Sequence, residues 1–443
     1  MPKSITKYKS YKDSEEGWID DIPSHWKTCR LKYLLSEVNE RSTTGEEELL
    51  SLSKYSGVIP KSSLEERAGQ ANSLVGYKKV YENHLVINKM QAVNGLLSVS
   101  KLKGITSPDY SIYKSQNTDC LNIYFLNYLL LQPEYLAEFK KRVTGVMEGF
   151  IRLYTDDLYD IKVIIPPVQE QTAITNFLDQ KTAKIDQAIA TKEKQITLLT
   201  EHKQILIQNT VIRGLNIDAP MQDSGVDWIG EIPEHWEVKR IKNIFQLIME
   251  PSEKNNDHEL LSIYTDIGVK PRKELKAKGN KASTTDGYWI VKKGDFIVNK
   301  LLAWMGAIGL SNYEGVTSPA YDILRSVKPI EGMFYHYLFR TKSCSAELKK
   351  HSRGIMDMRL RLYFDKFGVV MAPYPPKEEQ TTIVEFINAE SLKIDTAINL
   401  QQQQIDKLKE YKATLINSAV TGKIRVLGVE DISAEVKETE CTP

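Results

Sequence analysis

The chain has 443 residues, of which 41% are hydrophobic and 26% charged, a normal globular mixture with room for two or three domains. Its longest apolar stretch, residues 296–310, is too short to cross a bilayer and contains Lys300, so no membrane partner is expected. The four cysteines form no Cys-x-x-Cys pair, which argues against a zinc site, and a reducing, cytoplasmic location fits them best.

The sequence contains an internal duplication. Residues 18–26 read Trp-Ile-Asp-Asp-Ile-Pro-Ser-His-Trp, and residues 228–236, 210 positions later, read Trp-Ile-Gly-Glu-Ile-Pro-Glu-His-Trp. Further motifs recur at offsets of 209 to 211: Asn-Lys at 88–89 and 299–300, Thr-Ser-Pro at 106–108 and 317–319, Arg-Leu-Tyr at 152–154 and 361–363, and Pro-Pro-x-x-Glu-Gln at 166–171 and 375–380. Because the offset drifts by so little, the pattern indicates one duplicated domain and not a solenoid of short repeats. Two related sites with different specificities are expected.

Each half is predicted to begin with a globular α+β domain. Short runs rich in Val, Ile and Tyr, separated by Gly, Pro and Asn, predict strands. They lie at 85–87, 111–113, 296–298 and 321–324, and helical patches lie between them at 123–131 and 333–339.

A long helix is predicted to follow each domain. Pro167 and Pro376 stand where the first helical turn tolerates proline, and Glu170, Glu378 and Glu379 suit the positive end of the helix dipole. Apolar residues then recur at heptad spacing: Leu178, Ile185, Ile189, Ile196, Leu199 and Leu206 in one copy, and Ile387, Ile394, Ile398, Ile405, Leu408 and Leu415 in the other. Gly214 and Gly422 are candidate ends.

Two long amphipathic helices need partners, and the only similar apolar face for each helix is on the other helix. We therefore expect an antiparallel coiled coil with a pseudo-twofold axis and one domain at each end; the alternative is that each helix packs on its own domain. Lys192 and Gln401 occupy the same core position of the heptads, as do Lys203 and Lys412, and polar groups of this kind fix register at a cost in stability.

Net charge is only +1, but positive charge is concentrated locally. One basic stretch spans residues 270–281, and another spans residues 340–361. Local basic surface is typical of phosphate binding, although a solvated charged face explains either stretch taken alone. The compensating acids include a tail, residues 426–443, that is predicted to be disordered.

Motifs for catalysis are missing from the sequence. It contains no phosphate-binding Gly-x-x-x-x-Gly-Lys loop, no His-Glu-x-x-His and no Asn-Pro-Pro-Tyr or Asp-Pro-Pro-Tyr of an adenine methyltransferase, so no catalytic or metal-binding residue is assigned. Asp109 with Glu138 and Lys140 resembles a nuclease site, but the second copy has Ala320 in place of Asp109. The shared Trp and His residues are predicted to be framework: Trp26, Trp236, His25 and His235.

Taken in order and in duplicate, these motifs resemble the specificity subunit of type I restriction-modification systems, over residues 17–425. The resemblance implies two target-recognition domains that read a split, asymmetric double-stranded DNA sequence, with helices that act as a ruler and dock two modification (methyltransferase) subunits. Those partners would carry S-adenosylmethionine, and restriction motor-nuclease subunits would join them. Target-recognition domains would then occupy residues 1–165 and 215–374, and spacer helices residues 166–214 and 375–425.

Motifs common to both halves cannot distinguish two half-sites, so base-reading groups are expected where the copies diverge. Shared Lys89, Lys300, Arg152 and Arg361 are candidates for phosphate or framework contacts. The other DNA-binding candidates are Lys61, Arg67, Lys101 and Lys103 in the first half, and Lys270, Arg272, Lys273, Lys276, Lys278, Lys281, Arg353 and Arg359 in the second. Two other hypotheses remain open: a stand-alone DNA-modifying enzyme, and a coiled-coil scaffold that binds no DNA.

Overall fold

The computed structural model describes residues 5–64, 73–145, 151–274, 284–354 and 359–426. The predicted tail at 426–443 lies almost entirely outside the described residues. The chain divides into two compact units: unit 1 comprises residues 1–191 and 404–443, and unit 2 comprises residues 192–403. Each unit therefore contains one globular domain together with part of both long helices, α4 (Val168–Arg213) and α8 (Lys377–Val420).

The domain of unit 1 is built on a four-stranded antiparallel sheet. Its order is β10 (Leu97–Val99), β9 (Leu85–Asn88), β12 (Tyr110–Ser115) and β5 (Leu35–Glu37). The apolar run of β9 is buried on both faces, as expected of a central strand. Two-stranded ladders surround the sheet: β2 (Tyr11–Lys12) with β3 (Ile22–Pro23), β4 (Lys27–Arg30) with β13 (Lys162–Ile165), β6 (Leu50–Ser53) with β7 (Gly57–Pro60), and β8 (Lys78–Val80) with β11 (Gly104–Thr106).

Short helices cover this sheet, and each begins at a recognisable signal. The side chain of Asn122 caps α1 (Ile123–Leu130) by accepting from the amides of Tyr124 and Phe125. Pro133 opens α2 (Pro133–Arg142) at a position where its missing N–H is not needed. A third helix, α3 (Thr155–Tyr159), leads into β13.

Unit 2 repeats the plan. Its sheet has the order β17 (Phe245–Ile248), β24 (Tyr321–Ser326), β21 (Phe296–Asn299) and β22 (Ile308–Leu310). The rings of Phe245, Phe296 and Phe339 pack against one another at steep angles in its core, with the first two ring centroids 5.2 Å apart. The other elements are β14 (Met221–Asp223), β15 (Glu231–Pro233), β16 (Glu237–Arg240), β18 (Leu261–Tyr264), β19 (Gly268–Pro271), β20 (Trp289–Val291), β23 (Gly315–Thr317), β25 (Met371–Tyr374), α5 (Gly332–Phe339), α6 (Lys342–His351) and α7 (Phe364–Phe367). The predicted α+β class and the duplication are confirmed.

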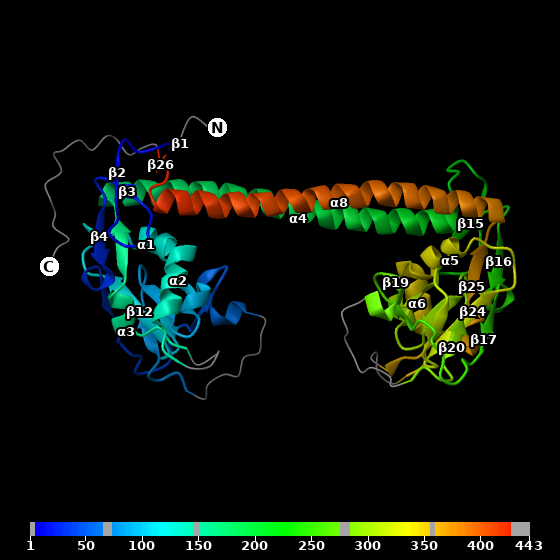
Figure 1. The fold of residues 1–443 in the computed structure, drawn as a ribbon. Helices are drawn as coiled ribbons and strands as arrows, with labels where there is room; N and C mark the ends of the chain where they lie inside the picture. Colours follow the sequence, from blue (N-terminus) through cyan, green and yellow to red (C-terminus); the bar gives the residue numbers. More distant parts are fainter. Residues whose placement is uncertain (1–4, 65–72, 146–150, 275–283, 355–358, 427–443) are drawn as a thin grey trace. The chain divides into compact units, whose positions relative to one another are not determined.

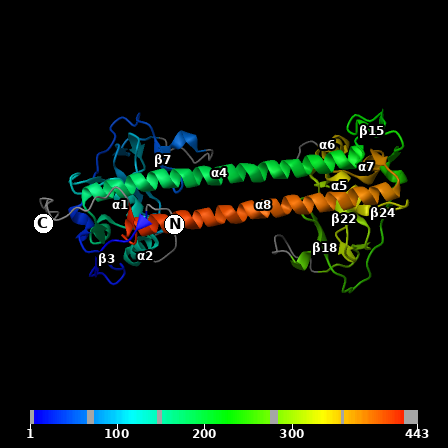
Figure 2. The same cartoon turned by 90° about the horizontal axis from the view of Figure 1, so that it is seen from above.

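The predicted pairing of the long helices is also confirmed. In each unit, the α4 and α8 segments run alongside one another in both views (Figure 1, Figure 2). None of the twelve predicted heptad positions is exposed; Leu178 and Ile387 are completely buried and the others are buried or half-buried. The apolar stripe that the sequence shows is therefore the surface on which the helices pack.

Polar contacts fix the antiparallel register. In unit 1, Lys412 donates to Asp186 at 2.7 Å, and in unit 2, Lys203 donates to Asp395 at 2.7 and 2.8 Å. These two ion pairs occupy equivalent positions of the duplicated helices. In unit 2, Lys192 donates to Gln401 at 3.0 Å, so the polar residues of that core position bond to each other. Among the described residues, no helix is apolar over a length that could span a membrane.

Candidate nucleic-acid interface

A buried carboxylate ties the N-terminal segment to the start of α4 in unit 1. Glu170 is fully buried, and it accepts hydrogen bonds from the Tyr8 hydroxyl and from Nε2 of His25, the latter at 2.8 Å. Burial, followed by the nearby carboxylate, raises the pKa of the Tyr8 hydroxyl, so this group remains a donor. The prediction that His25 is a framework histidine is confirmed.

Unit 2 has the same junction with one change. Glu379 accepts from Nε2 of His235 at 2.8 Å and from the indole N–H of Trp236 at 3.0 Å. In unit 1 Tyr8 takes the place of the indole donor, and the N–H of Trp26 is buried without a partner among the described residues. The sequence assigned these two glutamates only to the helix dipole, although the recurrence of Pro-x-His-Trp together with Pro-Pro-x-x-Glu-Gln was a signal that the motifs meet.

The glutamine of that motif fixes the neighbouring helix of the domain. Gln171 donates to the carbonyls of Cys120 and Pro166, both at 2.8 Å, and accepts from the amide of Asn122 at 2.8 Å. In unit 2, Gln380 donates to Pro375 at 2.8 Å and accepts from the amide of Glu331 at 2.9 Å. Each long helix is thus bonded at its first turn to the residue that caps α1 or α5.

The end of the other long helix reaches the same junction. In unit 1, Gly422 follows α8 with φ of +77°, and a Cβ at this position would lie 2.5 Å from Pro23 and 3.2 Å from Trp26. In unit 2, Gly214 follows α4 with φ of +74°, and its Cβ would lie 3.2 Å from both Trp236 and Glu379. Only glycine combines that backbone conformation with so close an approach.

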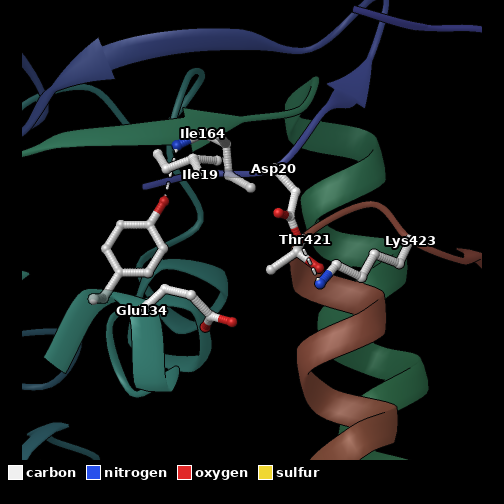
Figure 3. A pocket seen from close by; sticks show the side chains of 7 residues that line it. Ile19, Asp20, Glu134, Ile164, Thr421 and Lys423 are labelled. Atoms are coloured by element: carbon white, nitrogen blue, oxygen red, sulfur yellow. Dashed lines mark hydrogen bonds and ion pairs between the residues drawn. The ribbon is translucent and has the colours of Figure 1, made fainter. Parts of the chain in front are cut away.

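Further contacts hold the end of α8 on the first domain. Lys423 forms an ion pair with Asp20 at 2.8 Å, and these residues border a small hollow with Thr421 and Glu134 (Figure 3). Beyond them, β26 (Arg425–Val426) pairs with β1 (Ile5–Thr6). Each domain therefore binds the first turn of one long helix and the last turn of the other.

The structure brings the shared basic candidates together in pairs. The amide of Leu153 donates to the carbonyl of Lys89 at 3.0 Å, so Arg152 lies next to the Asn-Lys segment. The amide of Leu362 donates to the carbonyl of Lys300 at 2.8 Å, which places Arg361 in the same way. Within the described residues, the side chains of Arg152 and Arg361 form no ion pair, so both cations are available to a ligand.

The two shared lysines differ in their surroundings. Lys300 forms an ion pair with Asp322 at 3.1 Å and donates to the carbonyl of Pro319 at 3.3 Å, which holds the Thr-Ser-Pro turn. Burial raises the pKa of Asp322, while Lys300 opposes that shift. In unit 1, Ser111 stands where Asp322 is expected, and Lys89 forms no ion pair among the described residues. Lys300 therefore has a framework contact that Lys89 lacks among the described residues.

The remaining candidates of unit 1 lie apart from this pair. Lys61 is in η2 (Lys61–Ser63), while Lys101 and Lys103 precede β11 at the Val80–Gly104 end of its ladder, away from the Thr-Ser-Pro turn. Lys103 lies 5.5 Å from the ring of Tyr81, beside Glu47 and Glu48. Arg67 lies outside the described residues.

In unit 2, the basic candidates fall in two segments of the sequence. Lys270, Arg272 and Lys273 follow one another from β19 into η5 (Arg272–Glu274), where Lys273 pairs with Glu259 and Lys270 donates to the Tyr313 hydroxyl at 3.1 Å. Arg353 is held beside Arg361 by two backbone hydrogen bonds of 2.9 Å, and Arg359 is exposed. Lys276, Lys278 and Lys281 lie outside the described residues.

No group of three or more His, Cys, Asp or Glu side chains in the described part of the chain is arranged to hold a metal ion. Glu138, one of the two acids of the nuclease-like pattern, accepts from Arg142 at 2.9 Å and pairs with Lys141 at 3.1 Å on its own helix.

Comparison with known proteins agrees with this architecture. The family described as type I restriction modification DNA specificity domain matches residues 58–198. The type I restriction enzyme MjaVIII specificity subunit of Methanocaldococcus jannaschii is 24% identical over 434 residues, which cover 91% of this chain and 94% of that protein. The putative MjaX specificity subunit of the same organism is 26% identical over 332 residues, 70% of each chain.

Two solved structures share the fold. A chain from a study of complex assembly and conformational transition of the type I R-M system superposes with a TM-score of 0.64 at 14% identity, over 90% of this chain and 98% of that one. The HsdS subunit from Thermoanaerobacter tengcongensis gives 0.53 at 15% identity, with the same coverage. In its duplicated domains, its paired helices and its match over residues 58–198, the chain is similar to type I restriction-modification specificity subunits.

Proposed function

We propose that this chain reads a bipartite, asymmetric DNA target, one half-site with each domain, and that it contributes no catalytic group itself. The observation that carries the proposal is a junction repeated in both units beside divergent surfaces. Glu170 and Glu379 build the same framework, while the exposed residues between the shared motifs differ. One framework with two surfaces suits two different half-sites.

The partners follow from the same proposal. Two modification subunits would dock on the chain and supply S-adenosylmethionine and adenine methyl transfer, and restriction motor-nuclease subunits would join them in the cytoplasm. Arg152 and Arg361, which form no ion pair among the described residues, would contact DNA phosphates. The helix pair would set the spacing between the half-sites.

A methylome tests this directly. Cells that express the chain with its cognate modification subunit should show adenine methylation at a split sequence, and the purified chain alone should methylate nothing. Methyl transfer by the chain alone would support the stand-alone enzyme instead.

Modularity provides the second test. Exchange of residues 17–165 for the matching region of a relative should change one half-site only. A simultaneous change of both half-sites would contradict readout by two separate domains, and a lack of DNA retention with partners present would favour the scaffold.

A further inference from the structure

One turn has the same backbone in both units and different exposed side chains. We call residues 90–95 of unit 1 and 301–306 of unit 2 the variable turns. Each follows the shared Asn-Lys pair, and the asparagine side chain accepts from the amide two residues later, at 3.0 Å for Met90 and 3.1 Å for Leu301. The 3₁₀ helices η3 (Ala92–Asn94) and η6 (Ala303–Met305) come next.

The turns also close identically. The amide of Gly95 donates to Ala92, and that of Gly306 donates to Ala303, both at 2.9 Å. These glycines have φ of +77° and +93°, and both alanines are fully buried. Two turns of equal backbone geometry therefore hold equivalent positions on the two domains, and they differ in their exposed side chains and in half-buried Val93, which Trp304 replaces in unit 2.

The exposed side chains of the unit 1 turn are amides. Gln91 and Asn94 are both exposed, and Nδ2 of Asn94 donates to Oε1 of Gln91 at 2.8 Å. This bond leaves a donor, Nε2 of Gln91, and an acceptor, Oδ1 of Asn94, without further partners among the described residues. Adenine presents the complementary pair in the major groove, an N7 acceptor next to an N6 donor.

The equivalent positions in unit 2 are apolar. Leu302 is 39% exposed and Met305 52% exposed, with Leu301 beside them at 40%. Exposed apolar side chains grouped on one turn lack the hydrogen-bonding capacity to read a polar base edge. They can contact the methyl group of thymine, the apolar feature of the major groove.

Both turns are flanked by positive charge in equivalent places. Helix α2 packs against η3 and α6 packs against η6. The last turns of these helices hold Lys140, Lys141 and Arg142 in unit 1, where Glu138 pairs with the latter two, and Lys349 and Lys350 in unit 2, where Glu347 pairs with Lys350. Nζ of Lys349 lies 4.8 Å from the ring centroid of Trp304, which is a residue of η6. Arg152 and Arg361 lie beside the lysines that open the turns. A divergent centre with a basic border on both domains is the arrangement expected of a base-reading element between phosphate contacts.

We propose that the variable turns read base edges: Gln91 and Asn94 recognise an adenine in the half-site of unit 1, and Leu302 and Met305 contact a thymine methyl group in the half-site of unit 2. This inference rests on the proposed function, because it names the residues with which each domain distinguishes bases.

Single-atom changes in DNA test the proposal. The full chain in complex with its modification subunit is bound to duplexes in which one adenine at a time is replaced by 7-deazaadenine, or one thymine by uracil, and Kd is measured. Loss of one N7 acceptor in the half-site of unit 1 should weaken binding about fivefold or more. Loss of one methyl group in the half-site of unit 2 should weaken binding about fourfold.

Substitutions in one turn should remove one of these sensitivities and leave the other. A complex with Gln91→Leu and Asn94→Met should no longer respond to 7-deazaadenine but should keep its response to uracil. Leu302→Gln with Met305→Asn should do the reverse. Val327→Gln, an equally exposed apolar position of unit 2, should change neither response.

Milder variants guard against misfolding. Gln91→Glu keeps the shape of the side chain but removes its donor, so it should abolish the response to 7-deazaadenine; Met305→Leu stays apolar and should keep the response to uracil.

If the wild-type complex binds its target yet ignores every single-atom change, or if the variants respond as the wild type does, the proposal is wrong while the DNA function stands. If Leu302→Gln with Met305→Asn releases the modification subunit but still responds to uracil, the patch docks protein instead. A complex without any sequence preference would refute the proposed function itself.

Discussion

The two junction glutamates provide a matched pair for measuring what holds each domain to the helices. Replacement of Glu170 by Ala removes an acceptor that is completely buried and leaves the buried Tyr8 hydroxyl without its partner. A hydrogen bond to a charged group contributes about 1.5–3 kcal/mol, and His25 can partly recover by bonding to water because its side chain is 45% exposed. We therefore expect Glu170→Ala to lower the free energy of unfolding by about 3–4 kcal/mol.

Replacement of Glu379 by Ala should have a smaller effect. The Glu379 side chain is 27% exposed and that of His235 is 54% exposed, so water can replace part of the lost bonding. A loss of about 1–2 kcal/mol is expected. For units of this size, 1 kcal/mol shifts Tm by about 2–4 °C, so the variants should differ in Tm by several degrees.

Scanning calorimetry of the full chain measures both losses, and hydrogen exchange followed by mass spectrometry assigns each to a unit. Glu378→Ala is the control, because Glu378 is exposed in the same helical turn. Its replacement should lower the free energy of unfolding by less than about 1 kcal/mol. Equal losses for Glu170→Ala and Glu379→Ala, or a larger loss for Glu379→Ala, would refute the argument from burial.

Two other predictions concern the helix register and pH. One heptad inserted after Lys192 and another after Gln401 should preserve the helix register and lengthen the helix pair by roughly 10 Å. A methylome should then show both half-sites unchanged and a spacer about 3 base pairs longer. An unchanged spacer in a variant that still methylates would show that the helices do not set the spacing. Burial, followed by the charge of Arg340, lowers the pKa of His336 to about 4. The unfolded chain, with the ordinary histidine pKa of about 6.5, takes up the proton first as pH falls. The contribution of neutral His336 to the free energy of unfolding is therefore present above about pH 6.5 and is lost as pH falls toward 4. This loss should reach about 3 kcal/mol in unit 2. Urea titrations at several pH values should show that His336→Asn, which copies the equivalent Asn127, abolishes the loss. An unaltered pH dependence in this variant would contradict the assignment of the loss to His336.

Local patterns sufficed to predict the parts of the fold that repeat along the chain. Heptad spacing identified the faces on which α4 and α8 pack, since Leu178 and Ile387 are fully buried. The duplication identified the framework motifs, because a residue needed at both junctions appears twice. The histidines bonded to Glu170 and Glu379 follow from that logic.

Contacts specific to one unit could not be predicted in this way. Tyr8 precedes the recognised repeat, yet it bonds to Glu170, 162 positions away. Arg340 donates to the carbonyls of Gly306, Thr265 and Asp266, whereas its counterpart Leu131 is apolar, so the duplication conceals this role. The ion pair of Lys300 with Asp322 likewise depends on a residue that unit 1 lacks.

The glycine ends of the helices bear on the ancestry of the chain. Gly214 closes α4 against Trp236, and Gly422 closes α8 against Trp26, so each helix ends on the domain of the other repeat. A protein with a single repeat would satisfy both junctions by associating with a second copy of itself, and two identical domains would then select a palindrome. Under the proposed function, fusion of two such copies would remove that constraint, because mutations could then alter one recognition surface without altering the other.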